Sequence, residues 1–66
     1  MKNKIKSLRT ERNLTQEQLA SLAGISRVTL ALIENGKTNP DGKTIAALVQ
    51  ALGVPANQIF FDLDVV

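Results

Sequence analysis

The spacing of apolar residues along the chain predicts a series of short helices. Three of these residues recur three or four positions apart and share one face of a helix: Leu19, Leu22 and Ala23. Thr15, with Gln18 three residues later, has the pattern of a capping box at the start of that helix. Gly24 marks its end, because glycine enters the left-handed conformation without steric cost.

A second helix is predicted immediately afterwards, from about residue 27 to residue 35. Ser26 is its candidate N-cap, and Gly36 is placed to end it. The small residue Ala20 lies four positions before Gly24, where two crossing helices would need to approach closely. Two short helices joined by so tight a turn indicate a helix-turn-helix.

The two sides of this second helix differ. At about 100° per residue, Leu30 and Ile33 point the same way and would anchor the helix to a core. The opposite side, with Arg27 at its edge, carries four residues: Val28, Ala31, Leu32 and Asn35. A helix that is anchored by one side and exposes the other can enter the major groove of DNA.

Further helices are predicted on either side of this pair. One runs from about residue 3 to residue 12, since Ile5 and Leu8 lie three positions apart. Another begins at the N-cap Asp41 and ends at Gly53. Its apolar residues follow the spacing i, i+3, i+4, i+7: Ile45, Leu48, Val49 and Leu52.

A fifth, shorter helix is predicted after Pro55, which suits a first helical turn, and it would carry Ile59 and Phe60 inward. The predicted fold is therefore all-α. It is a compact five-helix bundle that contains a helix-turn-helix, and residues 1–66 form a single domain.

The last residues have a different periodicity. Three apolar residues alternate there with Asp62 and Asp64, as in a strand: Phe61, Leu63 and Val65. The first residues alternate more weakly, so a short antiparallel pairing of the two termini is one interpretation. The alternative is a frayed terminus, although a tail this apolar is a poor candidate for simple solvation.

Composition excludes several classes of protein. A chain of 66 residues buries only a small core. The absence of cysteine and histidine excludes disulfides and Cys/His zinc sites, and the carboxylates show no acid–base pairing. We therefore expect no enzyme activity, metal, cofactor or small-molecule ligand. The sequence lacks a membrane-length apolar run and a recognisable signal peptide, which favours a cytoplasmic location.

Charge favours a polyanionic partner only mildly. The chain has eight basic and six acidic residues, and two of the acidic residues, Asp62 and Asp64, lie in the tail. The alternative is an ordinary solvated basic surface. Aromatic residues make up only 3% of the chain, which disfavours modules that stack single-stranded bases on aromatic side chains.

The chain resembles the lambda-repressor-like, or Xre-type, DNA-binding domains over nearly its whole length. The matching residues upstream of the turn are Ile5, Leu8, Arg9, Leu14-Thr15-Gln16 and Leu19-Ala20. Those that follow are Gly24-Ile25-Ser26-Arg27, Ile33-Glu34-Asn35-Gly36-Lys37, Leu48, Leu52 and Gly53-Val54. Each fragment alone would be weak, but their joint order and spacing are specific.

The resemblance implies roles for particular residues. Arg9 would pair with Glu34 beneath the second motif helix; the alternative is two independent surface charges. Arg27 would read a base, because arginine can donate two hydrogen bonds to guanine, and the alternative is a phosphate contact. Val28 and Leu32 occupy the other base-reading positions. Many relatives carry polar residues there, whereas these two can meet only a thymine methyl group, so DNA shape or a protein contact would supply the remaining recognition.

The resemblance also implies contacts with the DNA backbone. Gln16 opens the first motif helix and would meet a phosphate. The other candidates lie on or after the second motif helix: Thr29, Asn35, Lys37, Thr38 and Lys43. For each of them the alternative is an ordinary solvated side chain.

These observations favour a sequence-specific regulator of transcription, most simply a repressor, that binds double-stranded DNA as a homodimer on a two-fold-symmetric operator. The dimer interface is expected in the C-terminal segment: Ile59, Phe60, Phe61, Leu63 and Val65. The alternative function is a protein-interaction module of antitoxin type, which would use the apolar side of the second motif helix or the tail.

Overall fold

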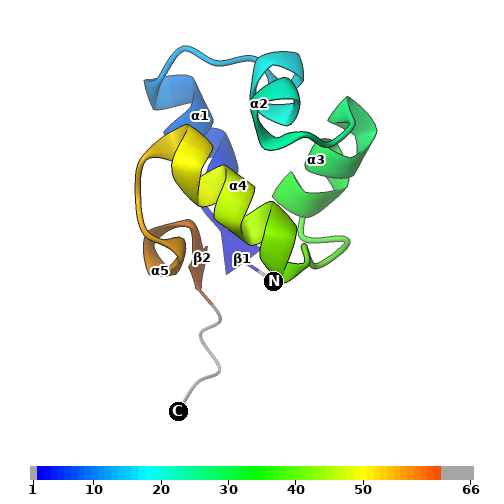
Figure 1. Ribbon diagram of the computed structural model, residues 1–66, viewed down its shortest axis with the longest axis vertical. Helices are drawn as coiled ribbons and strands as arrows, with labels where there is room; N and C mark the ends of the chain where they lie inside the picture. Colours follow the sequence, from blue (N-terminus) through cyan, green and yellow to red (C-terminus); the bar gives the residue numbers. More distant parts are fainter. Residues whose placement is uncertain (1, 62–66) are drawn as a thin grey trace.

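The computed structural model describes residues 2–61. Within this range the chain forms five helices and a two-stranded antiparallel sheet, which confirms the predicted fold class. The elements are β1 (Lys2–Asn3), α1 (Ile5–Glu11), α2 (Gln16–Ala23), α3 (Arg27–Glu34), α4 (Gly42–Leu52), α5 (Ala56–Ile59) and β2 (Phe60–Phe61). In Figure 1, α4 crosses the middle of the view, with α3 and α5 on opposite sides of it.

The helix-turn-helix is formed by α2 and α3, and local hydrogen bonds set its ends as predicted. The Thr15 amide donates to the Gln18 side chain (2.9 Å), and the Gln18 amide donates to the Thr15 hydroxyl (3.0 Å), which completes the capping box. Gly24 adopts φ 72°, and the following amide, that of Ile25, donates to the Ala20 carbonyl (3.0 Å). This left-handed turn redirects the chain into α3.

The core lies where α2 and α4 meet the other elements. α2 packs against both α3 and α4, and α4 also packs against α5. The large, fully buried side chains come from all five helices: Ile5, Leu19, Leu30, Ile33, Leu48, Leu52 and Ile59. The predicted anchoring of α3 through Leu30 and Ile33 is therefore confirmed, whereas Ile45 of α4 is only half-buried.

The predicted apolar face of α2 is only partly buried, because Leu19 and Ala23 are buried whereas Leu22 is 61% exposed. The buried arc of α2 consists of Leu19, Ala20 and Ala23, which together cover α3 and α4. At about 100° per residue, Leu22 lies about 110° from the middle of that arc. The predicted helical spacing of α2 was correct, but the positions of α3 and α4 decide which residues of α2 are buried.

The chain termini pair as β1 and β2, with Lys2 opposite Phe61 and Asn3 opposite Phe60. The predicted pairing is thus confirmed for residues 2–61, while Leu63 and Val65 lie outside the described residues. Asn3 was expected in the first helix and Phe60 in the fifth, but both belong to this sheet. The first helix starts only at Ile5, whose amide donates a hydrogen bond to the Asn3 side-chain oxygen (3.0 Å).

The cap of α5 also differs from the prediction. Pro55 is the N-cap residue, not a member of the first turn, and the helix extends only from Ala56 to Ile59. Proline has no amide hydrogen, so it costs no hydrogen bond at this position. The helix is short because the chain must turn back to pair with β1.

Candidate nucleic-acid interface

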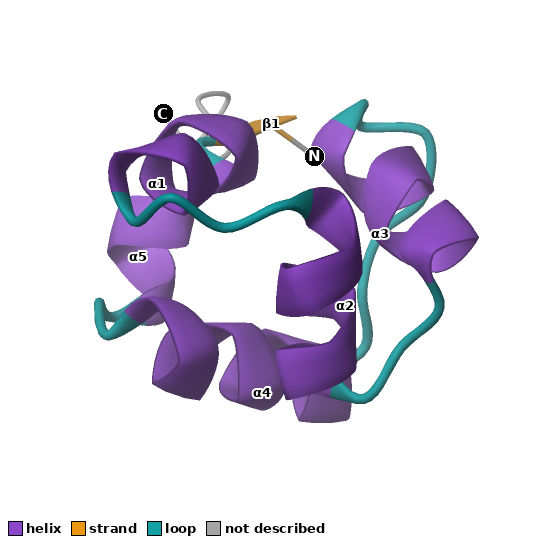
Figure 2. Cartoon of the chain, turned by 90° about the horizontal axis from the view of Figure 1, so that it is seen from above, coloured by secondary structure: helices purple, strands orange, loops and turns teal. Residues whose placement is uncertain are grey.

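The outer face of α3, defined here by Arg27, Val28, Leu32 and Asn35, is exposed. The Val28 side chain is 59% exposed and Leu32 is 41% exposed, and Arg27 and Asn35 are exposed as well. Figures 1 and 2 both place α3 at the edge of the molecule, with α2 on one side of it and no described element on the other. This face is therefore free to enter a groove of a larger partner.

The start of α3 is held by two residues that bond to each other. The Ser26 hydroxyl oxygen accepts a hydrogen bond from the Thr29 amide (3.0 Å), as predicted for an N-cap. The same hydroxyl donates to the Thr29 side-chain oxygen (2.8 Å). Thr29 was expected at the DNA backbone, and the structure gives it this capping contact. The cap fixes the first turn, which carries Arg27.

Beneath the outer face, Glu34 is the centre of a buried polar network. Arg9 donates through Nε to Glu34 Oε2 (2.8 Å) and through Nη2 to Oε1 (3.4 Å). The side chains are only 11% and 4% exposed, respectively. Arg9 also donates through Nη1 to the Leu14 carbonyl (3.0 Å). Arg9 of α1 thus ties the end of α3, through Glu34, to the loop before α2.

Gln16 joins the same network, donating through Nε2 to Glu34 Oε1 (3.0 Å). It was expected to meet a phosphate, and an amide nitrogen carries two hydrogens, so this bond leaves a second one for that contact. Within residues 2–61, no buried side-chain nitrogen or oxygen lacks a hydrogen-bond partner. The polar groups behind α3 are therefore satisfied, as a buried network must be to stabilise the fold.

A shallow depression brings two of the predicted residues together. Gln16 and Arg27 both line it, along with residues of α1 and of the loop that leads to α2. The base-reading candidate and the first phosphate-binding candidate therefore belong to one surface, although they lie on different helices.

The other predicted phosphate-binding residues follow the end of α3. The helix closes with a Schellman motif: Gly36 adopts φ 71°, and the Lys37 amide donates to the Leu32 carbonyl (2.9 Å). This turn leaves Asn35, Lys37 and Thr38 exposed in succession. Lys43 is exposed in the first turn of α4, at the far end of the connecting loop.

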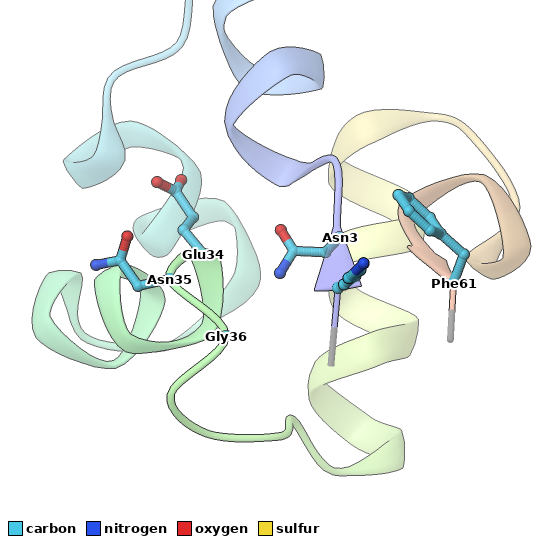
Figure 3. A pocket seen from close by; sticks show the side chains of 6 residues that line it. Asn3, Glu34, Asn35, Gly36 and Phe61 are labelled. Atoms are coloured by element: carbon cyan, nitrogen blue, oxygen red, sulfur yellow. The ribbon is translucent and has the colours of Figure 1, made fainter. Parts of the chain in front are cut away.

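Asn3 also positions α3, and it was missed at the sequence level. Its side-chain amide donates to the Ile33 carbonyl in the last turn of α3 (2.9 Å). Figure 3 shows Asn3 directed toward the end of α3, where Glu34 and Asn35 lie, while Phe61 occupies the other side of β1. The contact spans 30 positions of sequence, so no local pattern could indicate it.

The expected dimer interface needs a correction. Ile59 is 0% exposed and belongs to the core, so it is unavailable to a partner. Its position on the inner side of a one-turn helix explains the burial. Phe60 and Phe61 are half-buried, and the Lys4 ammonium group lies 5.8 Å from the centre of the Phe61 ring.

Residues 2–61 contain no cluster of three or more side chains suited to hold a metal ion. In the same part of the chain, every helix is too short or too polar to span a membrane.

The model of a helix-turn-helix family, HTH_3, matches residues 5–59. The chain is 45% identical over 64 residues to an uncharacterized HTH-type transcriptional regulator of Methanocaldococcus jannaschii, and the match covers 97% of each protein. It is 46% identical over 56 residues to the immunity repressor protein of Bacillus phage phi105, where the match covers 85% of this chain and 39% of the repressor.

Solved structures support the same family. The restriction-modification controller protein C.AhdI of Aeromonas hydrophila superimposes with a TM-score of 0.79 at 34% identity over 85% of both chains. The DNA-binding domain of the P22 c2 repressor superimposes with a TM-score of 0.76 at 28% identity, covering 80% of this chain and 70% of that one. The chain therefore belongs to the lambda-repressor-like helix-turn-helix family of DNA-binding transcriptional regulators, which are not enzymes.

Proposed function

We propose that this protein is a sequence-specific repressor that binds double-stranded DNA as a homodimer on a two-fold-symmetric operator. The outer face of α3 carries this proposal: it is exposed along the helix, while the inner face is fixed by the core and by the Glu34 network. A helix held in this way can enter the major groove without losing its position in the fold. Among relatives, the phage phi105 protein is named a repressor.

Individual roles follow from position and chemistry. Arg27 reads guanine with two hydrogen bonds, since it is exposed in the first turn of α3. Lys37 and Lys43 provide positive charge to the phosphates. Further backbone contacts come from polar side chains: Gln16, Thr29, Asn35 and Thr38.

The small number of base pairs that one α3 helix can contact supports a dimer. One α3 helix covers only a few base pairs, and each base contact is worth about 1–3 kcal/mol, too little to select one site in a genome. Two domains related by a two-fold axis would read half-sites about 34–36 Å apart. Phe60 and Phe61 are the described part of the proposed interface, and the predicted continuation at Leu63 and Val65 lies outside residues 2–61.

Selection of bound sequences from a pool of random duplexes tests the function. We expect a two-fold-symmetric motif, and an affinity that falls steeply as salt is raised, because phosphate contacts release counterions. Enrichment of no sequence would contradict the proposal. The antitoxin-type alternative, which the relatives reported above do not support, would instead give duplex binding no stronger than background.

A chain that ends at Phe61 tests the dimer, because it keeps every element described here. We expect sedimentation to show a monomer and the two-half-site duplex to bind more weakly. A Phe60→Ala variant of the full chain should show the same two changes. Normal dimerisation of both proteins would place the interface elsewhere.

A further inference from the structure

Asn35 and Gly36, at the end of α3, form the single asparagine–glycine pair of the chain. The backbone nitrogen after an asparagine can attack the side-chain carbonyl carbon, and glycine leaves that nitrogen least shielded because it has no Cβ. The other asparagines are followed by lysine, leucine, proline and glutamine, respectively: Asn3, Asn13, Asn39 and Asn57. Asn35 therefore has the least hindered route to a cyclic imide.

Both residues of this pair lie at the surface. Asn35 and Gly36 are exposed, and they line a depression that also includes Lys2 and Asn3. Figure 3 shows the Asn35 side chain pointing away from Asn3 at the end of α3. Water therefore reaches the amide group and the peptide bond that follows it. Gly36 adopts φ 71°, which residues with a side chain rarely adopt, so the turn itself keeps a glycine beside Asn35.

Two hydrogen bonds restrain this peptide in the folded chain. The Gly36 amide donates to the Ile33 carbonyl (3.0 Å), and the same carbonyl accepts a bond from the Asn3 side chain (2.9 Å). A nitrogen whose hydrogen is held in this way has to be released before it can attack. Exposed helix ends open locally at a much lower free energy than the core. The folded chain should therefore react, but more slowly than the unfolded chain.

Asp41 also precedes a glycine, Gly42, and provides a contrast within the chain. Its carboxylate accepts the Thr44 amide (2.9 Å) and carries a negative charge, so it is a poorer target for a nucleophile than a neutral amide. Ring closure at Asp41 followed by hydrolysis would also regenerate a carboxylate and leave the net charge unchanged. The reaction at Asn35 is the one that alters the charge of the surface.

We propose that the Asn35–Gly36 peptide is a site of intramolecular deamidation, and that the reaction lowers the affinity of the protein for DNA. In the first step the Gly36 nitrogen forms a bond to Asn35 Cγ, the bond from Cγ to Nδ2 breaks, and ammonia leaves with the Gly36 amide proton. In the second step water opens the five-membered imide at one of its two carbonyl carbons. The product is aspartate or isoaspartate, and isoaspartate adds a methylene group to the backbone.

The effect on DNA rests on the proposed function, in which Asn35 contacts the DNA backbone. Both products replace a neutral amide by a carboxylate on the outer face of α3. The neighbouring Glu34 is 4% exposed and bonded to Arg9, so the new carboxylate would be the exposed negative charge of this helix. It would repel the phosphates. Isoaspartate would also lengthen the turn that is closed by the bond from the Lys37 amide to the Leu32 carbonyl.

Peptide mass mapping tests the chemistry without DNA. The full chain is held in warm, mildly alkaline buffer beside a sample unfolded in urea, and both are digested at intervals. We expect Asn35 to convert to the acid in both samples, more slowly in the folded one, while the four other asparagines remain amides far longer. Asn35→Gln is the matched variant, because glutamine needs a six-membered ring and should stay unconverted. Asn35 that remains an amide in the folded chain after the unfolded sample has converted would overturn the proposal.

Asn35→Asp tests the consequence, because it carries the charge of the product from the start. Its Kd for the duplex enriched from the random pool should be about tenfold higher than that of the parent, since a bond to a charged group is lost and a like charge is gained. Asn57→Asp is the matched control: it makes the same exchange at an exposed position of α5, on the opposite side of α4 from α3 (Figure 1), and should bind like the parent. Melting curves check that both variants fold.

The results separate this inference from the function on which it rests. As the parent ages, its Kd should rise in step with the conversion of Asn35, whereas aged Asn35→Gln should keep its own initial Kd. Failure of the pool to yield any bound duplex would overturn the proposed function and the effect on DNA, while the mass mapping would still decide the chemistry. A duplex bound equally well by the parent and by Asn35→Asp would overturn the effect on DNA alone. An equal loss in aged Asn35→Gln would also overturn that effect, because the loss would then arise at another residue.

Discussion

The inner and outer faces of α3 belong to the same eight-residue helix but follow different rules. On the inner face, Leu30 and Ile33 are buried and Glu34 accepts bonds from Arg9 and Gln16. On the outer face, Val28 and Leu32 remain exposed. The fold therefore depends on the inner side of α3, and the residues on the outer side can differ according to the DNA sequence that is bound.

The largest expected effect is on the inner face. Glu34→Ala leaves the Arg9 guanidinium, which is only 11% exposed, without its carboxylate. Removal of one partner of a buried ion pair costs about 3–5 kcal/mol, which is much of the stability of so small a domain. Urea denaturation would measure this loss in the free energy of unfolding.

A more exposed ion pair at the end of α1 provides the control. Glu11 Oε1 lies 3.6 Å from Arg12 Nη1, with side chains that are 68% and 33% exposed. Because such pairs contribute about 0–1 kcal/mol, Glu11→Ala should change stability little. Equal losses in the Glu34 and Glu11 variants would show that burial does not separate the two pairs.

The next effect compares two leucines two positions apart. Leu30→Ala opens a cavity in the core and should cost about 2–5 kcal/mol. Leu32 is 41% exposed, so Leu32→Ala should cost less, about 1 kcal/mol or below. Thermal melting of both variants measures the difference, and similar melting temperatures would contradict the orientation of α3 described here.

The local features of α2 and α3 were more predictable from the sequence than the positions of the elements that pack against them. The capping box of Thr15 and Gln18, the left-handed Gly24 and the burial of Leu30 and Ile33 are consequences of local spacing. The positions of neighbouring elements are not local. For that reason the apolar spacing of α2 did not reveal that Leu22 is exposed, and the bond from Asn3 to α3 was missed.

The residues of the candidate site were only partly predictable from the sequence. Helical position placed Arg27, Val28 and Leu32 on the outer side of α3, and the family resemblance marked them as candidate base-reading residues. The structure exposes all three. Ile59 was the exception, because it was expected both to point inward from the fifth helix and to join the dimer interface. An apolar residue near a terminus serves a core and an interface equally well until the packing is known, and the structure confirms only the inward position. The groups that the outer face is proposed to contact belong to a DNA duplex and not to this chain. The sequence of the chain alone therefore does not identify them.

Arg27→Ala tests the outer face itself. Loss of a two-bond guanine contact should weaken operator binding by about 1–3 kcal/mol and relax the preference at one base per half-site. Stability should change little, because Arg27 is exposed. Lys6→Ala removes an exposed charge from α1 and should leave the preference intact. If Arg27 holds only a phosphate, the loss will be equal on operator and random duplexes.

The smallest effect concerns an exposed carboxylate, in contrast to the buried Glu34. Asp41 caps α4, accepting the Thr44 amide at 2.9 Å, and hydrogen bonds from the Thr44 side chain and amide hold the pKa of Asp41 below its ordinary value. A depressed folded-state pKa means that the charged cap stabilises the fold above the unfolded-state pKa. This stabilisation is lost as pH falls through the lower folded-state pKa.

Asparagine is the matched substitution, because it caps helices about as well as aspartate but does not titrate. The difference in melting temperature between the parent and Asp41→Asn isolates the titration of this one group, because every other residue is common to the two proteins. It should stay constant from pH 7 to pH 5 and shrink below about pH 4 as Asp41 protonates. A difference that holds at its neutral-pH value down to pH 2 would mean that the charge of Asp41 contributes nothing, and that the cap acts on α4 through its oxygen alone.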